Sequence, residues 1–295
     1  MSLLVVATYP VAGGPVLEGE VTITQEGAVC IGGVPMPSSQ GTAAMLGAAV
    51  QVARHLGTEL PKALVAGDIG RGDGTRAVYE RLPGAVAEHR PAVLAFHYMQ
   101  PVMALMRRAV EWLNRESPTT LLVADAGGMY AAKAAGLAPR FELMTPDVGE
   151  VGFLADPDVT HPAYVSHYLF GTQDFDPPVL ARTAYETQGS ARVLLIKGRR
   201  DHIVRDGTVE SVVEQPCVPE LEAIGGTGDT LTGLASGFLA AGFPTVDAAR
   251  CACLANREAG LAMHATPAMH AQDLVSVLPA VLAVNLCRWS GACAV

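Results

Sequence analysis

The sequence predicts an α/β fold with a mainly parallel central sheet, and three observations lead to this prediction. Short apolar runs that end in glycine or polar residues alternate with stretches of helical composition. Apolar residues make up 50% of the 295 residues, which is enough for a sizeable core. From residue 227 onward the composition is almost purely helical. We therefore expect one domain over residues 1–295, with a helical C-terminal section.

The first half of the chain contains most of the predicted strands. Residues 15–36 are expected to form a small β lid or hairpin, with pairing inside 21–31. Strands are predicted at 3–8, 63–70, 92–99 and 119–128, and helices at 41–56, 75–82 and 101–114. This alternating order favours parallel pairing, because each helix returns the chain to the start of the next strand.

The second half continues the alternation and then becomes helical. Strands are predicted at 141–146 and 191–198, and helices at 227–241, 245–265 and 271–287. Residues 155–178 are proline-rich and aperiodic, which indicates a surface excursion rather than a domain boundary. Ligands of open α/β sheets bind beyond the carboxyl ends of the strands, so the loops after the strands are where chemistry is expected.

Charge and composition limit the class of partner. The net charge of −9 argues against nucleic acid or an anionic membrane as the main partner and favours a small-molecule substrate. The first basic residue is Arg54, and no apolar run approaches the roughly 18 residues that span a membrane, so we expect a cytoplasmic protein. The sequence does not decide between a monomer and a homo-oligomer. The six cysteines are scattered and are expected to be reduced structural thiols.

The stretch "GGTGD", residues 225–229, is the strongest chemical signal in the chain. Apolar residues follow it at helical spacing, so the glycines lie at a helix N-terminus, where free N–H groups and the helix dipole favour an anion such as phosphate. Asp229 would then lie in the first turn, beside whatever those amides hold. An alternative is that Thr227 or Asp229 only caps the helix. Three clustered glycines are unnecessary for a cap and costly in entropy, which favours a functional site.

At these residues the sequence resembles the ribokinase-like superfamily, whose members carry a Gly-x-Gly-Asp segment at a late helix start. The resemblance implies a three-layer sandwich that uses ATP or ADP with Mg²⁺. It also implies that Asp229 is the catalytic base. The anion hole that holds the transferred phosphoryl group is then formed by Gly225, Gly226, Thr227 and Gly228.

Two further segments extend this resemblance. "TPDVGE", 145–150, is similar to a superfamily motif near the metal, in which Glu150 matches and would reach Mg²⁺ through water. Asp147 replaces the Asn or His of that motif, and the segment is also a good helix start. "LLIKG" ends a predicted strand with Lys197 and Gly198, where the superfamily passes close to the nucleotide; a solvated surface lysine is the alternative.

The acceptor side of the predicted site is less well defined. "ALVAGDIGRGDG", 63–74, loosely resembles the sugar-kinase pattern, which implies that Gly67 and Asp68 contact the substrate. Its glycines lack the spacing of a dinucleotide-binding fingerprint. "GGTGDTLTG" and "AQDLVSVLP", both in the last third, instead resemble the NAD(P)H-hydrate dehydratase branch.

The combined interpretation is phosphoryl transfer from ATP or ADP to a hydroxyl of a small metabolite, with Mg²⁺. The first alternative is an NAD(P)H-hydrate dehydratase, in which phosphorylation is followed by loss of phosphate. The second alternative is a nucleotide-binding protein without turnover, which the change at Asp147 and the weak early match would permit.

Overall fold

The computed structural model describes residues 2–159 and 176–291, and its strands form one sheet. The sheet order is β11-β10-β9-β8-β7-β6-β1-β5-β2-β3-β4. The strands are β1 (Leu3–Tyr9), β2 (Leu17–Ile23), β3 (Val29–Ile31), β4 (Val34–Pro35), β5 (Lys62–Gly67), β6 (Val93–His97), β7 (Leu121–Ala124), β8 (Leu143–Met144), β9 (Val193–Ile196), β10 (Asp201–Arg205) and β11 (Thr208–Val213). The central run from β9 to β5 is parallel, and the strands on both sides of it pair antiparallel.

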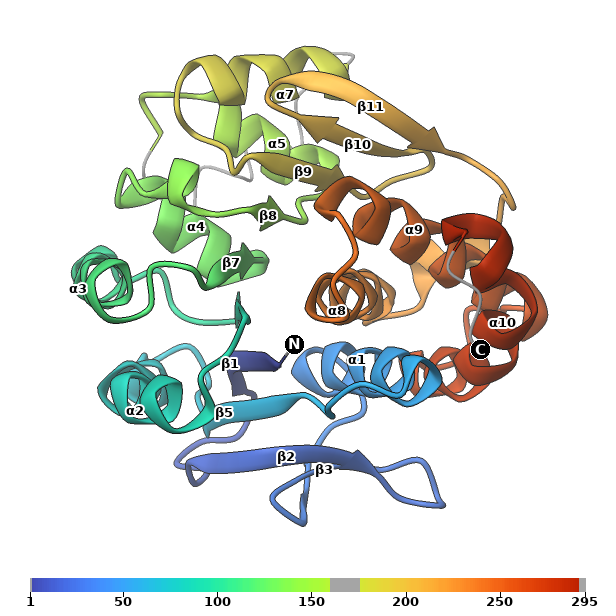
Figure 1. Ribbon diagram of the computed structural model, residues 1–295, viewed down its shortest axis with the longest axis horizontal. Coiled ribbons are helices and arrows are strands. Elements are labelled where there is room, and N and C mark those ends of the chain that lie inside the picture. Colours follow the sequence, from blue (N-terminus) through green and yellow to red (C-terminus); the bar gives the residue numbers. More distant parts are fainter. Residues whose placement is uncertain (1, 160–175, 292–295) are drawn as a thin grey trace.

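Helices cover both faces of the sheet (Figure 1). The described helices are α1 (Thr42–Leu56), α2 (Asp73–His89), α3 (Met103–Glu116), α4 (Ala126–Ala134), α5 (Val148–Ala155), α7 (Pro177–Glu186), α8 (Thr227–Ala240), α9 (Thr245–Ala262) and α10 (Ala271–Ser290). One buried cluster joins the sheet to α1, α8, α9 and α10, and the other joins it to α2, α3, α4, α5 and α7. The result is the three-layer α/β sandwich that the sequence predicts.

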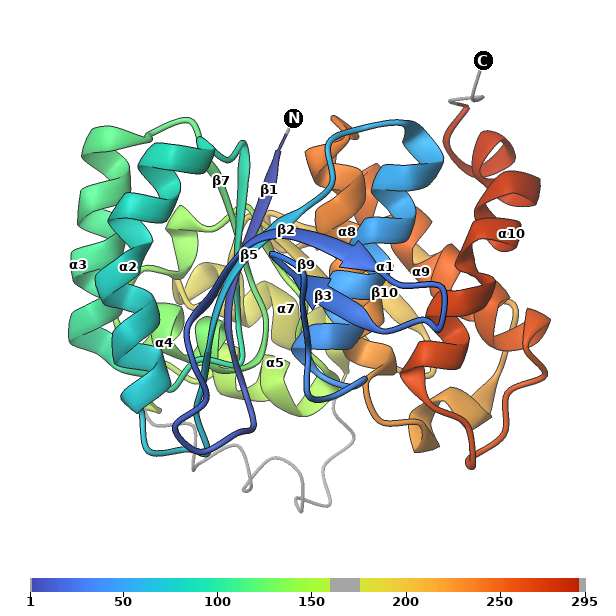
Figure 2. The same ribbon diagram turned by 90° about the horizontal axis from the view of Figure 1, so that it is seen from below.

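The antiparallel hairpin of β2 and β3 lies at one edge of the sheet, in front in Figure 2. Its Val21 and Ile31 are buried against the α1 side, while much of the hairpin stays exposed or half-buried. The predicted small β element at 15–36 is therefore confirmed as a hairpin. Whether it acts as a lid stays a prediction.

Most predicted elements are present, and the differences have local causes. Helix α2 runs through Pro83 to His89 instead of ending near Leu82, because its buried face continues with Ala85 and Val86. The predicted strand at 119–128 ends at Ala124, and α4 begins at Ala126 after its N-cap Asp125. The β10–β11 hairpin was not predicted; its outer strand is largely exposed and so lacks a buried apolar run.

Helix α10 combines a buried and an exposed face. It is long and apolar enough to cross a membrane by length and composition alone, yet it packs on α1 and α9. Leu274, Leu278 and Leu282 are fully buried, whereas Val284 on the other face is 79% exposed. The buried leucines identify α10 as part of the core on the α8 side.

The cysteines do not all match the expectation of reduced thiols. Cys30, Cys217, Cys251 and Cys253 are free. Cys287, near the end of α10, is disulfide-bonded, so the prediction was wrong for this residue. The sixth cysteine, Cys293, lies outside the described residues, as do 160–175 of the predicted surface excursion at 155–178.

Candidate active site

Polar side chains gather at the carboxyl ends of the parallel strands. His97 is the last residue of β6, Asp125 directly follows β7, and Lys197 directly follows β9. Asp68 and Thr145 take the same position after β5 and β8. This edge is where open α/β sheets place their ligand sites.

Helix α8 begins at the same edge without a side-chain cap. Its N-cap is Gly226, which has a φ of 99°, a backbone conformation that favours glycine. The Thr227 hydroxyl donates to the carbonyl oxygens of Leu221 and Ile224 rather than accepting from the helix amides. The cap interpretation is thus not supported for Thr227. The Thr227 N–H itself donates to the Ile224 carbonyl oxygen at 3.4 Å, so the N–H groups of Gly228 and Asp229, in the first turn of α8, are the candidates for an anion site.

Asp229 lies in that first turn and is only 7% exposed. Its Oδ1 lies 2.9 Å from Nε2 of His97, and the Tyr98 hydroxyl hydrogen-bonds to the same carboxylate. Burial alone would raise the pKa of Asp229, but the hydrogen bond and charge of His97, together with Lys197, outweigh it and lower the pKa. Asp229 is therefore ionised at neutral pH. Its carboxylate hydrogen-bonds to His97 and Tyr98 and does not cap α8.

Lys197 and Asp125 form a buried ion pair next to this carboxylate. Lys197 Nζ lies 3.1 Å from Asp125 Oδ1, and the Thr232 hydroxyl donates to Asp125 Oδ2 at 2.7 Å. Burial would lower the pKa of Lys197, but the charges of Asp125, Glu150 and Asp229 raise it above its ordinary value. A Cβ added to Gly228 would lie 3.5 Å from Nζ, so a permanent positive charge sits beside the amides of α8.

Asp147 and Glu150 form a reciprocal capping box at the start of α5. Glu150 N donates to Asp147 Oδ1, and Asp147 N donates to Glu150 Oε2, both at 2.8 Å. The Tyr130 hydroxyl donates to the other Glu150 oxygen at 2.6 Å. Burial raises the pKa of Glu150 to about 7, and nearby Asp125 and Asp147 add to the shift while Lys197 opposes it. Both carboxylates thus have a structural role as well as a position near Lys197.

A cavity of about 700 Å³ opens beside Lys197 and the start of α8. It is lined by Asp147, Lys197, Gly198, Arg199, Asp201, Cys217, Val218, Pro219, Leu221, Glu222, Thr227, Gly228, Leu231, Asn256 and Arg257. Arg257 is fixed by Asp201 at 2.7 Å and by the carbonyl oxygen of Gly198 at 2.9 Å. The volume suits a ligand of nucleotide size.

The β5–α2 turn is closed on itself. Asp68 accepts from the backbone N–H groups of Gly70, Arg71, Gly72 and Thr75 at 2.9 to 3.0 Å, and these bonds outweigh its burial and lower its pKa. A Cβ at Gly67 would lie 2.4 Å from the Val11 carbonyl oxygen, so glycine is required there for packing. Both residues shape the turn, and their predicted contact with the substrate stays a prediction.

The structure thus brings most of the predicted residues to one edge of the sheet. Asp147, Lys197, Gly198, Thr227 and Gly228 line one cavity, and Asp229 is buried next to Lys197. His97, Asp125 and Tyr98 were not predicted as site residues. A usable signal was present, because each lies where an apolar strand run ends, as Lys197 does.

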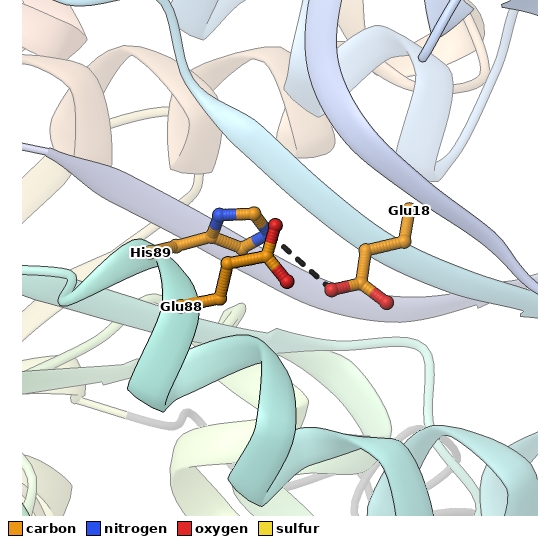
Figure 3. Close-up of side chains that lie close together, drawn as sticks. All are labelled: Glu18, Glu88 and His89. Atoms are coloured by element: carbon orange, nitrogen blue, oxygen red, sulfur yellow. Dashed lines mark ion pairs between the residues drawn. The ribbon is translucent and has the colours of Figure 1, made fainter.

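A second cluster of titratable side chains lies elsewhere. Glu18 on β2 faces Glu88 and His89 at the end of α2 (Figure 3), and His89 Nε2 is 3.3 Å from Glu18 Oε1. Arg81 also binds Glu18, at 2.7 Å. No residue of this cluster touches the Asp229 site in the described contacts.

Comparisons with known proteins place the chain in a family. The sequence model of the carbohydrate-kinase family described as NAD(P)H-hydrate dehydratase matches residues 103–280. The uncharacterized protein MJ1337 of Methanocaldococcus jannaschii is 33% identical over 238 residues, covering 81% of this chain and 98% of that protein.

Solved structures share the fold at low identity. YxkO of Bacillus subtilis has a TM-score of 0.55 at 17% identity and covers 98% of this chain and 92% of its own. Tetrameric phosphofructokinase-2 of Escherichia coli has a TM-score of 0.55 at 14% identity, covering 95% and 99%. Pyridoxal kinase of Staphylococcus aureus has a TM-score of 0.52 at 14% identity, covering 88% and 87%.

Proposed function

The chain belongs to the family described as NAD(P)H-hydrate dehydratase and has the ribokinase-like fold, and from this premise we propose that it transfers a phosphoryl group from ATP or ADP to a hydroxyl of a small molecule. The observation that carries the proposal is the start of α8. There an uncapped helix N-terminus, Lys197 and the ionised Asp229 meet. Phosphoryl transfer needs donors for the phosphate and a base for the hydroxyl.

The large cavity supports nucleotide binding. Lys197 and Gly228 line one part of it and would hold the phosphates. A nucleoside would fit among other lining residues, which include Cys217, Val218, Pro219, Leu221, Glu222, Asn256 and Arg257. Asp229 then lies on the inner side of the phosphate site, where an acceptor hydroxyl would approach from the sheet edge.

The acidic residues at the start of α5 fit a magnesium ion. Asp147 is exposed, lines the cavity and uses its Oδ1 for the capping box, so its other oxygen is available to a hard cation. Both oxygens of Glu150 are engaged, so this residue would act through water. When bound, Mg²⁺ neutralises phosphate charge.

The acceptor has two candidates, each supported by a different observation. The family match supports hydrated NAD(P)H. However, the match begins at residue 103, so it does not include the acceptor-side segment 63–74. On that side the segment 63–74, which loosely resembles the sugar-kinase pattern, favours a different small hydroxylated metabolite. Phosphorylation is common to both.

One assay separates these candidates. The protein is incubated with Mg²⁺ and ATP or ADP, together with hydrated NADH or a panel of sugars and alcohols, while nucleotide consumption and nicotinamide absorbance are followed. Recovery of absorbance would identify the dehydratase, and consumption with a panel member alone would identify a kinase. Nucleotide binding without consumption would favour a binding protein and contradict the proposal.

A further inference from the structure

A continuous hydrogen-bonded chain leads from the backbone of β1 to the base Asp229. The Thr42 hydroxyl donates to the Thr8 carbonyl oxygen at 2.8 Å, and its oxygen lies 3.3 Å from Nδ1 of His97. His97 Nε2 lies 2.9 Å from Asp229 Oδ1. Thr42 is 3% exposed and His97 0%, so no solvent competes for these bonds. The chain joins β1, α1, β6 and α8 behind the carboxylate.

Counting the hydrogens along this series of hydrogen bonds shows which nitrogen of His97 carries a proton. A hydroxyl group has one hydrogen, and that of Thr42 points to the Thr8 carbonyl. Towards His97 the Thr42 oxygen can therefore only accept, so Nδ1 carries a proton. The remaining proton lies between Nε2 and the Asp229 carboxylate, and either an imidazolium–carboxylate pair or a neutral pair satisfies that bond.

The surrounding charges favour the ion pair. Asp125 and Asp229 are both buried, and Lys197 binds Asp125. Asp125 Oδ2 also lies 3.9 Å from His97 Nε2, and the Tyr98 ring packs 4.2 Å from the imidazole. One lysine faces two buried carboxylates, and an imidazolium at His97 supplies the second positive charge.

We propose that His97 is a doubly protonated positioning residue, which holds Oδ1 of Asp229 and keeps this base ionised while Thr42 fixes the ring. This inference rests on the proposed function. During transfer, the acceptor oxygen forms its bond to the terminal phosphorus, and the bond from that phosphorus to the leaving phosphate oxygen breaks. The hydroxyl proton moves to the other oxygen of Asp229. His97 keeps both of its protons, so it acts through Asp229.

The first test needs no turnover. In the nucleotide-free protein, ¹⁵N chemical shifts report whether the His97 ring is doubly protonated, and the ¹³C shift of the Asp229 carboxyl reports its titration. We expect the ¹⁵N shifts of a doubly protonated ring. In His97→Phe the apparent pKa of Asp229 should rise by roughly one to three units, because a buried carboxylate loses a donor and a positive charge. A neutral His97 ring, or an unmoved Asp229 titration, would overturn the proposal.

Matched variants separate positioning from general packing. His97→Gln keeps a donor without the charge and should give a smaller rise, which also covers the case that His97→Phe fails to fold. Thr42→Ser should behave as wild type, whereas Thr42→Val removes the acceptor for Nδ1 and should shift Asp229 in the same direction as His97→Phe. His89→Phe removes another nearly buried histidine that faces a carboxylate and should leave Asp229 unchanged (Figure 3).

The second test is the pH profile of turnover with whichever acceptor is active. The acidic limb of kcat/KM should move upward in His97→Phe by the same amount as the Asp229 titration. An unmoved limb would contradict the link between His97 and the base. Because the spectroscopic arm decides without turnover, an inactive wild-type protein would count against the proposed function alone.

Discussion

Asp229 is the residue on which the proposed chemistry depends. Asp229→Asn keeps the shape and the contact with His97 but cannot take a proton, so we expect a roughly 10²- to 10⁴-fold loss of turnover with nucleotide affinity near wild type. Steady-state turnover and calorimetric nucleotide binding measure the two effects. Asp247→Asn, in the first turn of α9, is a matched control at a residue that does not line the cavity. Wild-type turnover in Asp229→Asn, after its thermal unfolding has been checked, would exclude the mechanism.

Glu150 should make stability depend on pH. Its pKa is raised from 4.5 to about 7, chiefly by burial. Between these values the folded protein binds a proton that the unfolded chain has released, so the free energy of unfolding falls as pH rises and levels off above about 7. Glu150→Gln should remove this contribution, on the order of 1 kcal/mol per pH unit.

Urea unfolding of wild type and Glu150→Gln at several pH values in this range measures the difference. Glu80→Gln, an exposed site on α2, is the control. A constant difference between Glu150→Gln and wild type at every pH would show that burial does not perturb this carboxyl.

At the residue scale, the sequence identified those candidate site residues that are next to glycines in the chain. Asp229 and Lys197 were visible because "GGTGD" and "LLIKG" break an apolar pattern. His97 and Asp125 were missed, although each lies where an apolar strand run ends, because their importance arises from contacts with α8 that are remote in sequence. Only the folded sheet brings these residues together.

At the scale of elements, the close approach of α1 and α8 supports the proposed anion site. A Cβ at Gly233 would lie 2.1 Å from the Met45 carbonyl oxygen. Gly233→Ala should therefore force the two helices apart and destabilise the protein by about 1–3 kcal/mol or more. Thermal unfolding measures the loss of stability, and reduced nucleotide affinity should accompany it because the proposed anion site lies at the start of α8.

Gly84→Ala, in a helix on the other side of the sheet, is the control for Gly233→Ala. Gly84 lies in α2, and a Cβ there meets nothing within 4 Å. The change should stabilise the protein by about 0.5–1 kcal/mol, because alanine loses less backbone entropy in a helix. If both alanine variants have the same stability, helix contact is not what requires Gly233.

The predicted elements were most accurate where burial is continuous. The three C-terminal helices and β1 match the sequence pattern closely, since each has a long apolar face. Helix α4 was missed because "DAGGMYAAKA" opens with two glycines, which usually end an element. Those glycines are required by packing: a Cβ at Gly127 would lie 1.8 Å from the Met99 carbonyl oxygen.

At the scale of the molecule, the site joins distant parts of the chain. His97 comes from β6, Lys197 follows β9, and Asp229 comes from α8, so a ligand at their junction connects the sheet to the α8 layer. The sequence could predict these elements separately but not their meeting point, apart from the general rule for strand ends.

Ligand binding should therefore stabilise the whole fold. With Mg²⁺ and nucleotide at about a hundredfold excess over Kd, linkage gives about 2.7 kcal/mol, which corresponds to a rise of roughly 5 °C in Tm for a chain of this size. Lys197→Met should lower Tm without ligand, because it leaves Asp125 buried and unpaired, and it should also lose most of the ligand-induced rise. Lys62→Met on β5 should keep the full rise. The informative quantity is the rise within each variant, measured by scanning calorimetry with and without nucleotide. An equal rise in Lys197→Met and Lys62→Met would place the nucleotide away from the start of α8 and contradict the proposed site.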